Sequence, residues 1–394
     1  MTIEDFIDHW TYRIQNRITD VELQWFKRIG VTLKKLYDNT LSVDSLEYRE
    51  LIASDLHQLQ RLLNKAHTLN RKDIESMFRE ITDKAYSMGE EIADLKDTAI
   101  SGKAAYRAMV TPLLRQTMRN YNAMSKSTTT DRVYRDTMRR MVNRMTIDPE
   151  RINRHQAMRQ AVTQLAQEGV NYVKFDNKKN AYTRRLDSSV RASLSGEMSQ
   201  VVSAIQEKLG QEIDSDAIEI SVETACAWDH LDCQGKIFTL ENFEKLQAFE
   251  VAETIDGEKV QLGGSRQIGQ YNCRHMTSNF LIGISEPSFS KEELEKINKK
   301  NKDGIVFDGR KLALYDATQL QRQLETEQRK HRGALEIIRQ VGGNDPAFKQ
   351  DKKELWATIQ GLRKQYNRLG DTLAPHAIIR KPGRMYNINQ RGFR

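Results

Sequence analysis

Proline and glycine are scarce in the first part of this chain of 394 residues. There are six prolines in all, the first of them Pro112, and Gly30 and Gly89 are the only glycines among the first hundred residues. Both residue types interrupt helices, so little in this quarter of the chain opposes long helical segments. We therefore expect the N-terminal quarter to be almost entirely helical.

Long apolar runs and a disulfide framework are missing as well. The longest uncharged apolar run lies around 280–284, far below the roughly 18 apolar residues that a membrane-spanning helix needs. The acidic start, Met-Thr-Ile-Glu-Asp, lacks the basic-then-apolar order of a signal peptide. The only cysteines are Cys226, Cys233 and Cys273, an odd number. We expect reduced thiols, no membrane partner, and a soluble protein that is made and kept in a cytoplasm.

Charge is distributed in blocks along the chain. The net charge is +8, and it divides into −4 for residues 1–100, +11 for 101–200, −8 for 201–300 and +9 for 301–394. Blocks of this kind are typical of a chain that contacts a polyanion through its basic parts and protein through the others.

Helical periodicity dominates the first 97 residues, where apolar side chains recur at steps of three and four. Thr19 with Glu22 has the spacing of a capping box, as does Asp44 with Glu47. Each pair predicts a helix start, and the first of them predicts a break between two amphipathic helices.

The pattern continues beyond these pairs. Asn70 precedes another apolar stripe, and 101–168 has the pattern of three helices separated at 125–130 and 148–149. We therefore expect 1–168 to form a helical bundle or a stack of helical hairpins.

Basic residues recur along the second and third of these helices. Few acidic residues interleave, so the series suits contact with nucleic-acid phosphate, and a solvated helix face is the alternative. No aromatic row accompanies it, which argues against base stacking. The candidate DNA-contacting residues are Arg132, Arg135, Arg139, Arg140, Arg144, Arg151 and Arg154, together with Arg380, Lys381 and Arg384 in a C-terminal tail that we expect to be extended.

Beyond Gly169 the pattern indicates an α+β module with short antiparallel strands. Strands are predicted at 172–175, 218–222 and 236–239 and in a hairpin around Asp308-Gly309, with a long helix at 182–209 and a loop at 256–272. Two further helices, at 316–340 and 347–369, flank a turn-rich Gly-Gly-Asn-Asp-Pro segment. The expected organisation is a helical region at 1–168, the α+β module at 169–315, a helical hairpin at 316–370 and a basic tail at 371–394.

All three cysteines and two of the eight histidines fall in two short pieces, Cys226 to Gly235 and Tyr271 to His275. Thiolates and imidazoles are the ligands that Zn²⁺ prefers, although the spacings differ from those of ordinary zinc modules. The alternatives are a structural zinc site, buried cysteines with hydrogen-bonded histidines, and a metal-dependent nuclease that acts on DNA. The zinc candidates are Cys226, His230, Cys233, Cys273 and His275; the nuclease would use Asp229 with His230 and His275.

These pieces also support a family resemblance. Trp-Asp-His230, Gln234-Gly235-Lys-Ile-Phe and Asn272-Cys273-Arg-His275, followed by Phe-Leu-Ile-Gly-Ile-Ser, are similar to the phage minor capsid protein 2 family, which in turn resembles the Mu F-like head morphogenesis proteins. The resemblance spans about residues 170–370, while Cys226 and Cys233 depart from the family pattern. It implies that Gln234, Gly235 and Asn272 belong to a structural signature without catalytic groups.

The resemblance also implies a role. Members of this family are minor proteins of tailed-phage heads, found near the portal protein and the major capsid protein, with no established enzymatic activity in this core. We therefore expect a head morphogenesis protein of a tailed phage or prophage, made in the bacterial host cytoplasm and located in the virion, inside the capsid. We expect it to contact packaged double-stranded DNA without sequence preference, and we expect no cofactor other than the zinc considered above.

Overall fold

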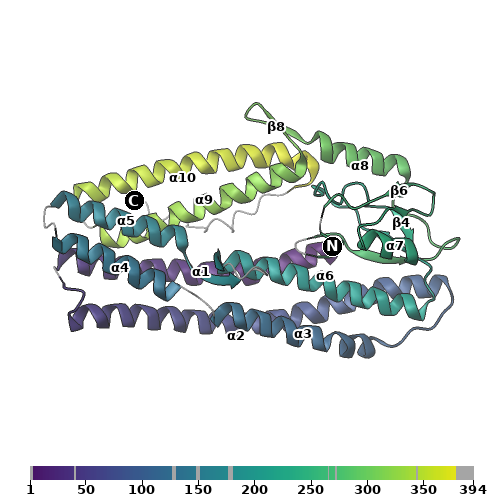
Figure 1. The fold of residues 1–394 in the computed structure, drawn as a ribbon, viewed down its shortest axis with the longest axis horizontal. Coiled ribbons are helices and arrows are strands. Elements are labelled where there is room, and N and C mark those ends of the chain that lie inside the picture. Colours follow the sequence, from purple (N-terminus) through teal and green to yellow (C-terminus); the bar gives the residue numbers. More distant parts are fainter. Residues whose placement is uncertain are drawn as a thin grey trace.

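The computed structural model describes residues 3–39, 41–126, 130–147, 151–175, 181–264, 266–270, 273–342 and 345–378, and it confirms a mainly helical α+β fold (Figure 1). The helices are α1 (Ile3–Asp38), α2 (Leu46–Leu95), α3 (Lys103–Lys126), α4 (Thr130–Ile147), α5 (Arg151–Glu168), α6 (Leu186–Glu212), α7 (Leu240–Gln247), α8 (Lys291–Asp303), α9 (Leu314–Val341) and α10 (Pro346–Leu373). The strands are β1 (Asn171–Phe175), β2 (Ala181–Arg185), β3 (Ala217–Ile220), β4 (Ile237–Thr239), β5 (Ala252–Glu253), β6 (Lys259–Val260), β7 (Thr277–Phe280), β8 (Ile305–Phe307) and β9 (Arg310–Leu312).

Two helices account for most of the first 97 residues, and the predicted interruption at Thr19 is wrong. Thr19 lies inside α1, where its hydroxyl donates to the Gln15 carbonyl at 3.1 Å. Asn70 lies inside α2 and donates from its side-chain amide to the Tyr121 hydroxyl of α3 at 2.8 Å. Both polar side chains therefore have partners within or between helices, so they do not cap a new one.

The start of α2 is one residue away from the predicted cap. Ser45, not Asp44, is the N-cap, and its hydroxyl accepts from the Tyr48 amide at 3.2 Å. α3 ends at Lys126 and α4 begins at Thr130, and α4 ends at Ile147 and α5 begins at Arg151. The predicted break at 148–149, and the centre of the one at 125–130, lie outside the described residues.

One hydrophobic core extends through the long helices. It contains side chains from α1 to α6 and from the adjoining parts of α9 and α10. The two glycines of the first hundred residues lie where helices approach closely. A Cβ on Gly30 would lie 2.6 Å from the Ile337 carbonyl oxygen of α9, and a Cβ on Gly89 would lie 2.3 Å from the Leu209 side chain of α6. At both positions glycine therefore allows a helix contact that a side chain would prevent.

The α+β module is built around a small antiparallel sheet with the strand order β4-β3-β7. Three two-stranded pairs accompany it, β1-β2, β5-β6 and β8-β9. In the last of these, Asp308 and Gly309 both have positive φ, 50° and 76°, as a type I′ turn requires, so the predicted hairpin is confirmed.

Other parts of the module differ from expectation. Residues 181–185 form β2, paired with β1, so the helix predicted from 182 begins at Leu186. The predicted loop at 256–272 contains β6, and α7, α8 and β7 were not predicted.

The C-terminal hairpin of α9 and α10 joins the two regions. The start of α9 and the end of α10 pack with β8 in a second core cluster that contains Ile305, Leu324 and Tyr366, while Ile337 and Phe348 belong to the main core. Pro375 lies in a single 3₁₀ turn, not in extended chain, and Arg380, Lys381 and Arg384 lie outside the described residues.

The four-part domain organisation stays a prediction. Within the described residues, no helix combines the length and the apolar character needed to cross a membrane.

Candidate functional site

Strand pairing brings the two Cys/His pieces together. β3 and β7 are antiparallel, with Ile220 opposite Thr277, so the residues that follow β3 lie beside those that precede β7. The pairing extends one step further, because the Ser221 amide donates to the Met276 carbonyl at 2.8 Å. The loop that contains Cys226, His230 and Cys233 therefore folds over the short segment that contains Cys273 and His275.

The sulfur of Cys273 lies at the centre of this cluster. It is 3.3 Å from His230 Nδ1 and 3.4 Å from His275 Nδ1, and Cys226 Sγ is 3.4 Å from His275 Nε2. His230, Cys273 and His275 are buried and each offers a ligand atom within 4.8 Å of the others. Cys233 is also buried, but its thiol donates to the His230 carbonyl at 3.1 Å and it packs in the apolar cluster with Ile220 and Phe238.

A shell of polar groups orients the two imidazoles. His230 Nε2 lies 2.8 Å from the Arg266 carbonyl oxygen, and the Arg266 guanidinium in turn pairs with Asp229 at 2.8 Å. His275 Nε2 lies 3.4 Å from Gln234 Oε1, which accepts from the Glu223 amide at 2.9 Å.

The predicted signature residues lie in the same shell. Gln234 is fully buried, and its amide also donates to Asn298 of α8 at 2.6 Å. Gly235 has a φ of +69°, and a Cβ there would lie 2.2 Å from Leu294 of α8, so glycine is needed on two counts. Asn272 lies outside the described residues.

Burial keeps the cluster uncharged in the absence of a cation. It raises the pKa of all three thiols, that of Cys233 to about 12. It also lowers the pKa of His230, and it lowers the pKa of His275 to about 3. A neutral thiol is a poor nucleophile, so these groups do not suit Cys–His covalent catalysis.

The nuclease interpretation is not favoured by the geometry. The side chains of His230 and His275 are 0 % and 3 % exposed, so a DNA phosphate has no access to either. Asp229, the third group of that hypothesis, is engaged by Arg266.

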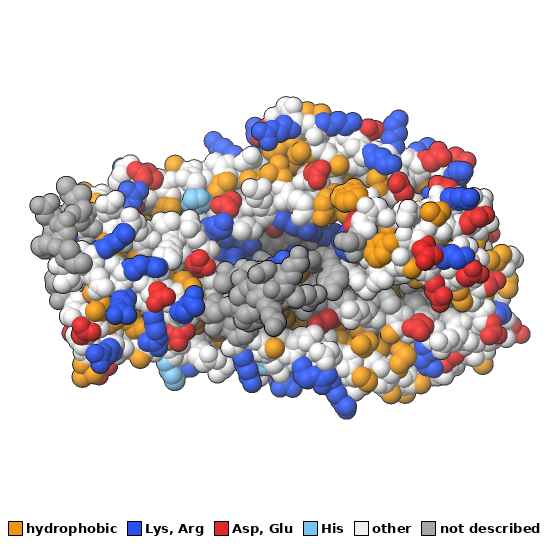
Figure 2. Space-filling view, viewed as in Figure 1, with side chains coloured by type: hydrophobic (Ala, Val, Ile, Leu, Met, Phe, Trp, Pro, Cys, Tyr) orange, Lys and Arg blue, Asp and Glu red, His pale blue; other side chains and the backbone are white. Residues whose placement is uncertain are grey.

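The basic series on α4 lies on the surface. Arg132, Arg135 and Arg139 are exposed and follow one another at helical spacing along one face. Arg135 pairs with Asp131 at 2.5 Å, while Arg140 and Arg144, also exposed, donate to glutamine side chains of α5. The end formed by α4 and α5, at the left of Figure 2, shows many basic side chains, and acidic side chains gather at the opposite end.

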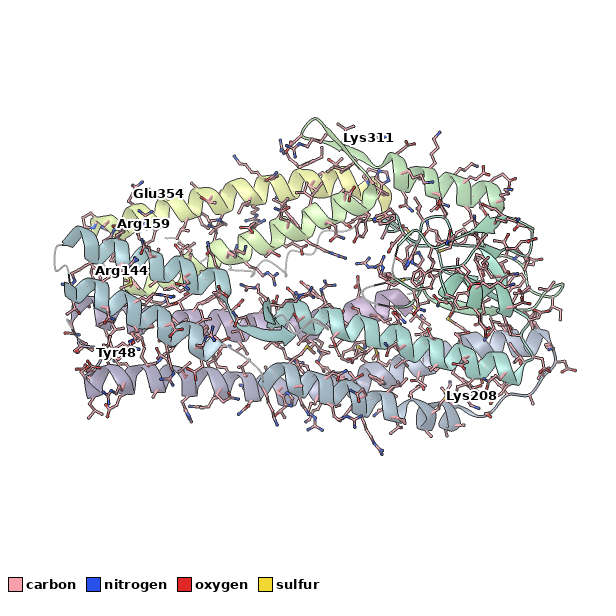
Figure 3. The ribbon with its side chains drawn as sticks, in the orientation of Figure 1. Tyr48, Arg144, Arg159, Lys208, Lys311 and Glu354 are labelled. Atoms are coloured by element: carbon pink, nitrogen blue, oxygen red, sulfur yellow. The ribbon has the colours of Figure 1, made fainter. Side chains whose placement is uncertain are left out.

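Two other arginines of the series are placed differently. Arg154 is half-buried: it donates to the Tyr37 carbonyl and its guanidinium lies 5.3 Å from the centre of the Tyr37 ring. The side chain of Arg151 is outside the described residues. Near Arg144, Arg159 joins α5 to α10 through Asp351 at 3.0 Å and Glu354 at 3.3 Å (Figure 3).

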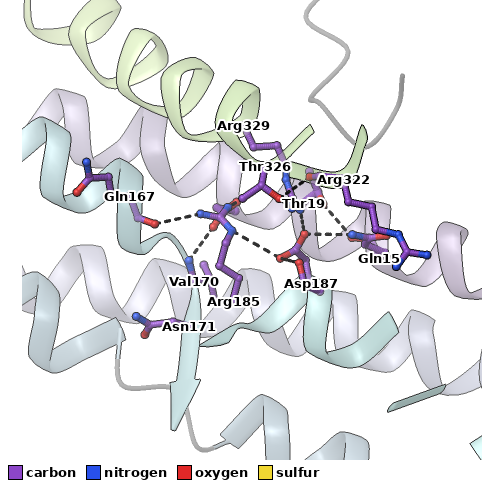
Figure 4. Close-up of polar contacts among 12 residues, drawn as sticks. Gln15, Thr19, Gln167, Val170, Asn171, Arg185, Asp187, Arg322, Thr326 and Arg329 are labelled. Atoms are coloured by element: carbon purple, nitrogen blue, oxygen red, sulfur yellow. Dashed lines mark hydrogen bonds and ion pairs between the residues drawn. The ribbon is translucent and has the colours of Figure 1, made fainter. Parts of the chain in front are cut away.

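A buried ionic cluster was not anticipated from the sequence. Asp187, at the start of α6, pairs with Arg329 of α9 and accepts from Gln15 of α1 at 3.2 Å, and Arg185 pairs with Glu22 of α1 (Figure 4). The cluster ties the start of α6 to the middle of α1 and of α9. Local sequence patterns do not reveal such a cluster, because Arg329 and Gln15 lie 142 and 172 residues from Asp187.

A family model described as phage minor capsid protein 2 matches residues 26–366. No curated protein matches the chain, and no solved structure does.

Proposed function

Since this chain belongs to the phage minor capsid protein 2 family and so has the role of a structural protein of the phage head, we propose that it lies inside the shell of a tailed phage or prophage. There it lies next to portal protein and major capsid protein, and it contacts packaged DNA. The observation that supports the DNA contact most strongly is the exposed arginine row of α4. The proposal has two parts, the contact with DNA and the contact with other head proteins.

The DNA contact follows from charge and exposure. Arg132, Arg135 and Arg139 are exposed and share a face of α4. Each phosphate that an arginine neutralises releases counterions, so binding of this kind is insensitive to sequence and weakens steeply as salt rises. These properties suit a protein that contacts a packaged genome without reading it.

The test compares two triple variants of equal charge change. The first replaces Arg132, Arg135 and Arg139 by glutamate, and the matched control replaces three exposed lysines of α8 by glutamate: Lys296, Lys299 and Lys300. Binding to a short DNA duplex is measured by fluorescence anisotropy over a range of salt concentrations. We expect the α4 variant to bind more weakly and to lose about one unit of salt slope per lost phosphate contact, and the α8 variant to keep most of the wild-type slope. Equal slopes for the wild type and the α4 variant would contradict the proposal.

The contact with head proteins is supported by the charge asymmetry. The acidic α+β module lies at the end opposite the basic α4 surface, so one end suits protein partners while the other faces DNA. Crosslinking of intact particles followed by mass spectrometry tests this arrangement. We expect crosslinks from α7 and α8 to portal protein or major capsid protein; crosslinks confined to the α4 end would contradict it.

A further inference from the structure

The hydrogen-bond partners of the two buried imidazoles determine which ring nitrogen holds a proton. A carbonyl oxygen only accepts, so His230 Nε2, 2.8 Å from the Arg266 carbonyl, must be its donor. Gln234 Oε1 accepts from the Glu223 amide, which fixes its orientation, so His275 Nε2 is a donor toward it at 3.4 Å. The tautomers assigned from these partners leave both Nδ1 atoms unprotonated.

Both Nδ1 lone pairs face the same sulfur. Cys273 Sγ is 3.3 Å from His230 Nδ1 and 3.4 Å from His275 Nδ1. A neutral thiol has one proton and can donate to only one of the two nitrogens, which leaves the other buried acceptor without that donor. If the thiol of Cys226 instead donated to His275 Nε2, that nitrogen would direct its lone pair toward Gln234 Oε1, and two acceptors would face each other.

A cation between the three atoms removes this conflict. Zinc bonds of about 2.3 Å to sulfur and about 2.0 Å to nitrogen, set at a tetrahedral angle, separate the sulfur from each nitrogen by roughly 3.5 Å. The two observed separations of 3.3 and 3.4 Å are within a few tenths of an ångström of that value. The N–H of His230 donates to a backbone carbonyl, and that of His275 to an amide oxygen, as is usual for metal-bound histidines.

We propose that Cys273, His230 and His275 bind one zinc ion inside the α+β module. These three residues offer ligand atoms within 4.8 Å of one another. The other two thiols do not join them, because the Cys226 sulfur lies beside His275 Nε2, the nitrogen on the far side of that ring, and Cys233 packs among apolar side chains. A thiolate and two imidazoles are ligands that zinc prefers and that Mg²⁺ and Ca²⁺ do not.

The site would have a structural purpose. The sheet that it borders has three strands of three or four residues, and the apolar cluster beneath it is small. Small cores commonly depend on a metal or another crosslink for stability. A zinc ion here would crosslink the loop after β3 to the segment before β7, and so would hold these two parts of the module together. It would have no role in catalysis.

The test uses the full chain, purified without added zinc or chelator and with any affinity tag removed. Elemental analysis should find about one zinc per chain in the wild type and little in Cys273→Ser, while Cys233→Ser, a matched loss of a buried thiol, keeps its zinc. Exchange with Co²⁺ gives an independent reading: we expect the visible bands of tetrahedral cobalt and a thiolate charge-transfer band in the wild type and in Cys233→Ser.

If Cys273→Ser does not fold, the wild type alone still decides. We then expect its thermal midpoint to fall when chelator is added and to recover when zinc is restored. Folded wild-type protein with less than about a tenth of an equivalent of zinc and no cobalt bands would overturn the proposal. So would equal zinc contents in Cys273→Ser and Cys233→Ser. None of these outcomes depends on the role in the phage head.

Discussion

Replacing Asp187 by alanine removes the carboxylate around which α1, α6 and α9 are joined. The side chains of Asp187 and Arg329 are each 4 % exposed, and that of Arg185 is 11 % exposed. Removing one partner of a buried ion pair costs about 3–5 kcal/mol, because the opposite charge stays buried. We therefore expect Asp187→Ala to lower the free energy of unfolding by about this amount, a large fraction of the stability of an ordinary domain.

Two controls separate this effect from simple loss of an ion pair. Asp83 pairs with Arg107 through two hydrogen bonds at the surface, and we expect Asp83→Ala to have a far smaller effect because water screens that pair. The double variant Asp187→Leu with Arg329→Met removes both charges, and we expect it to recover much of the stability that the single variant loses.

Urea denaturation followed by circular dichroism measures all three variants. Hydrogen exchange by mass spectrometry then locates the effect, which we expect in the central turns of α1 and α9. The reasoning would be refuted if Asp187→Ala and Asp83→Ala destabilised the protein equally, or if the double variant were less stable than Asp187→Ala.

Two further predictions concern the loss of stability at low pH and a close contact between two helices. Burial alone would raise the pKa of Glu212, but the hydrogen bonds that its carboxylate accepts, among them one of 2.9 Å from the Ser101 amide, lower that pKa to about 2. The ionised carboxylate therefore contributes about 3 kcal/mol to the free energy of unfolding above pH 4.5, and this contribution is lost as the pH falls toward 2. The difference in thermal midpoint between the wild type and Glu212→Gln should therefore narrow from pH 6 to pH 3, and a constant difference would contradict this. Gly30→Ala should lower the free energy of unfolding by about 1–3 kcal/mol, because the added Cβ would meet the Ile337 carbonyl. Gly196 lies in an open part of α6, and Gly196→Ala should raise the free energy of unfolding by about 0.5–1 kcal/mol. Urea denaturation compares the two, and a loss of stability in both variants, or in neither, would show that the close contact is not what matters.

The sequence predicted the helices better than it predicted their interruptions. Periodic apolar residues and the scarcity of glycine and proline indicated long helices, and α1 and α2 confirm this. The false break at Thr19 arose because a capping box is a local pattern, while Glu22 pairs with Arg185, 163 residues away. Tertiary partners of that kind leave no mark at short sequence separation.

The module was predicted in outline, and so was the meeting of its two Cys/His pieces, but the strand pairing that brings them together was not. The β-branched strand before Ser221 and the turn at Asp308-Gly309 have local signatures, and both are confirmed. β7, Thr-Ser-Asn-Phe, has no alternation to mark it, yet its register with β3 is what brings Cys273 to His230. The family resemblance, read from the residues around His230 and His275, is confirmed by the match over residues 26–366.

The role in the phage head is tested most directly by the composition of the particle itself. Phage particles are purified by density gradient and treated with nuclease and protease, and this protein is then quantified against portal protein by isotope-dilution mass spectrometry. We predict a low, constant number of copies per portal that is protected from protease until the shell is opened. Absence of the protein from particles, while it is abundant in the lysate that produced them, would contradict a structural role in the head.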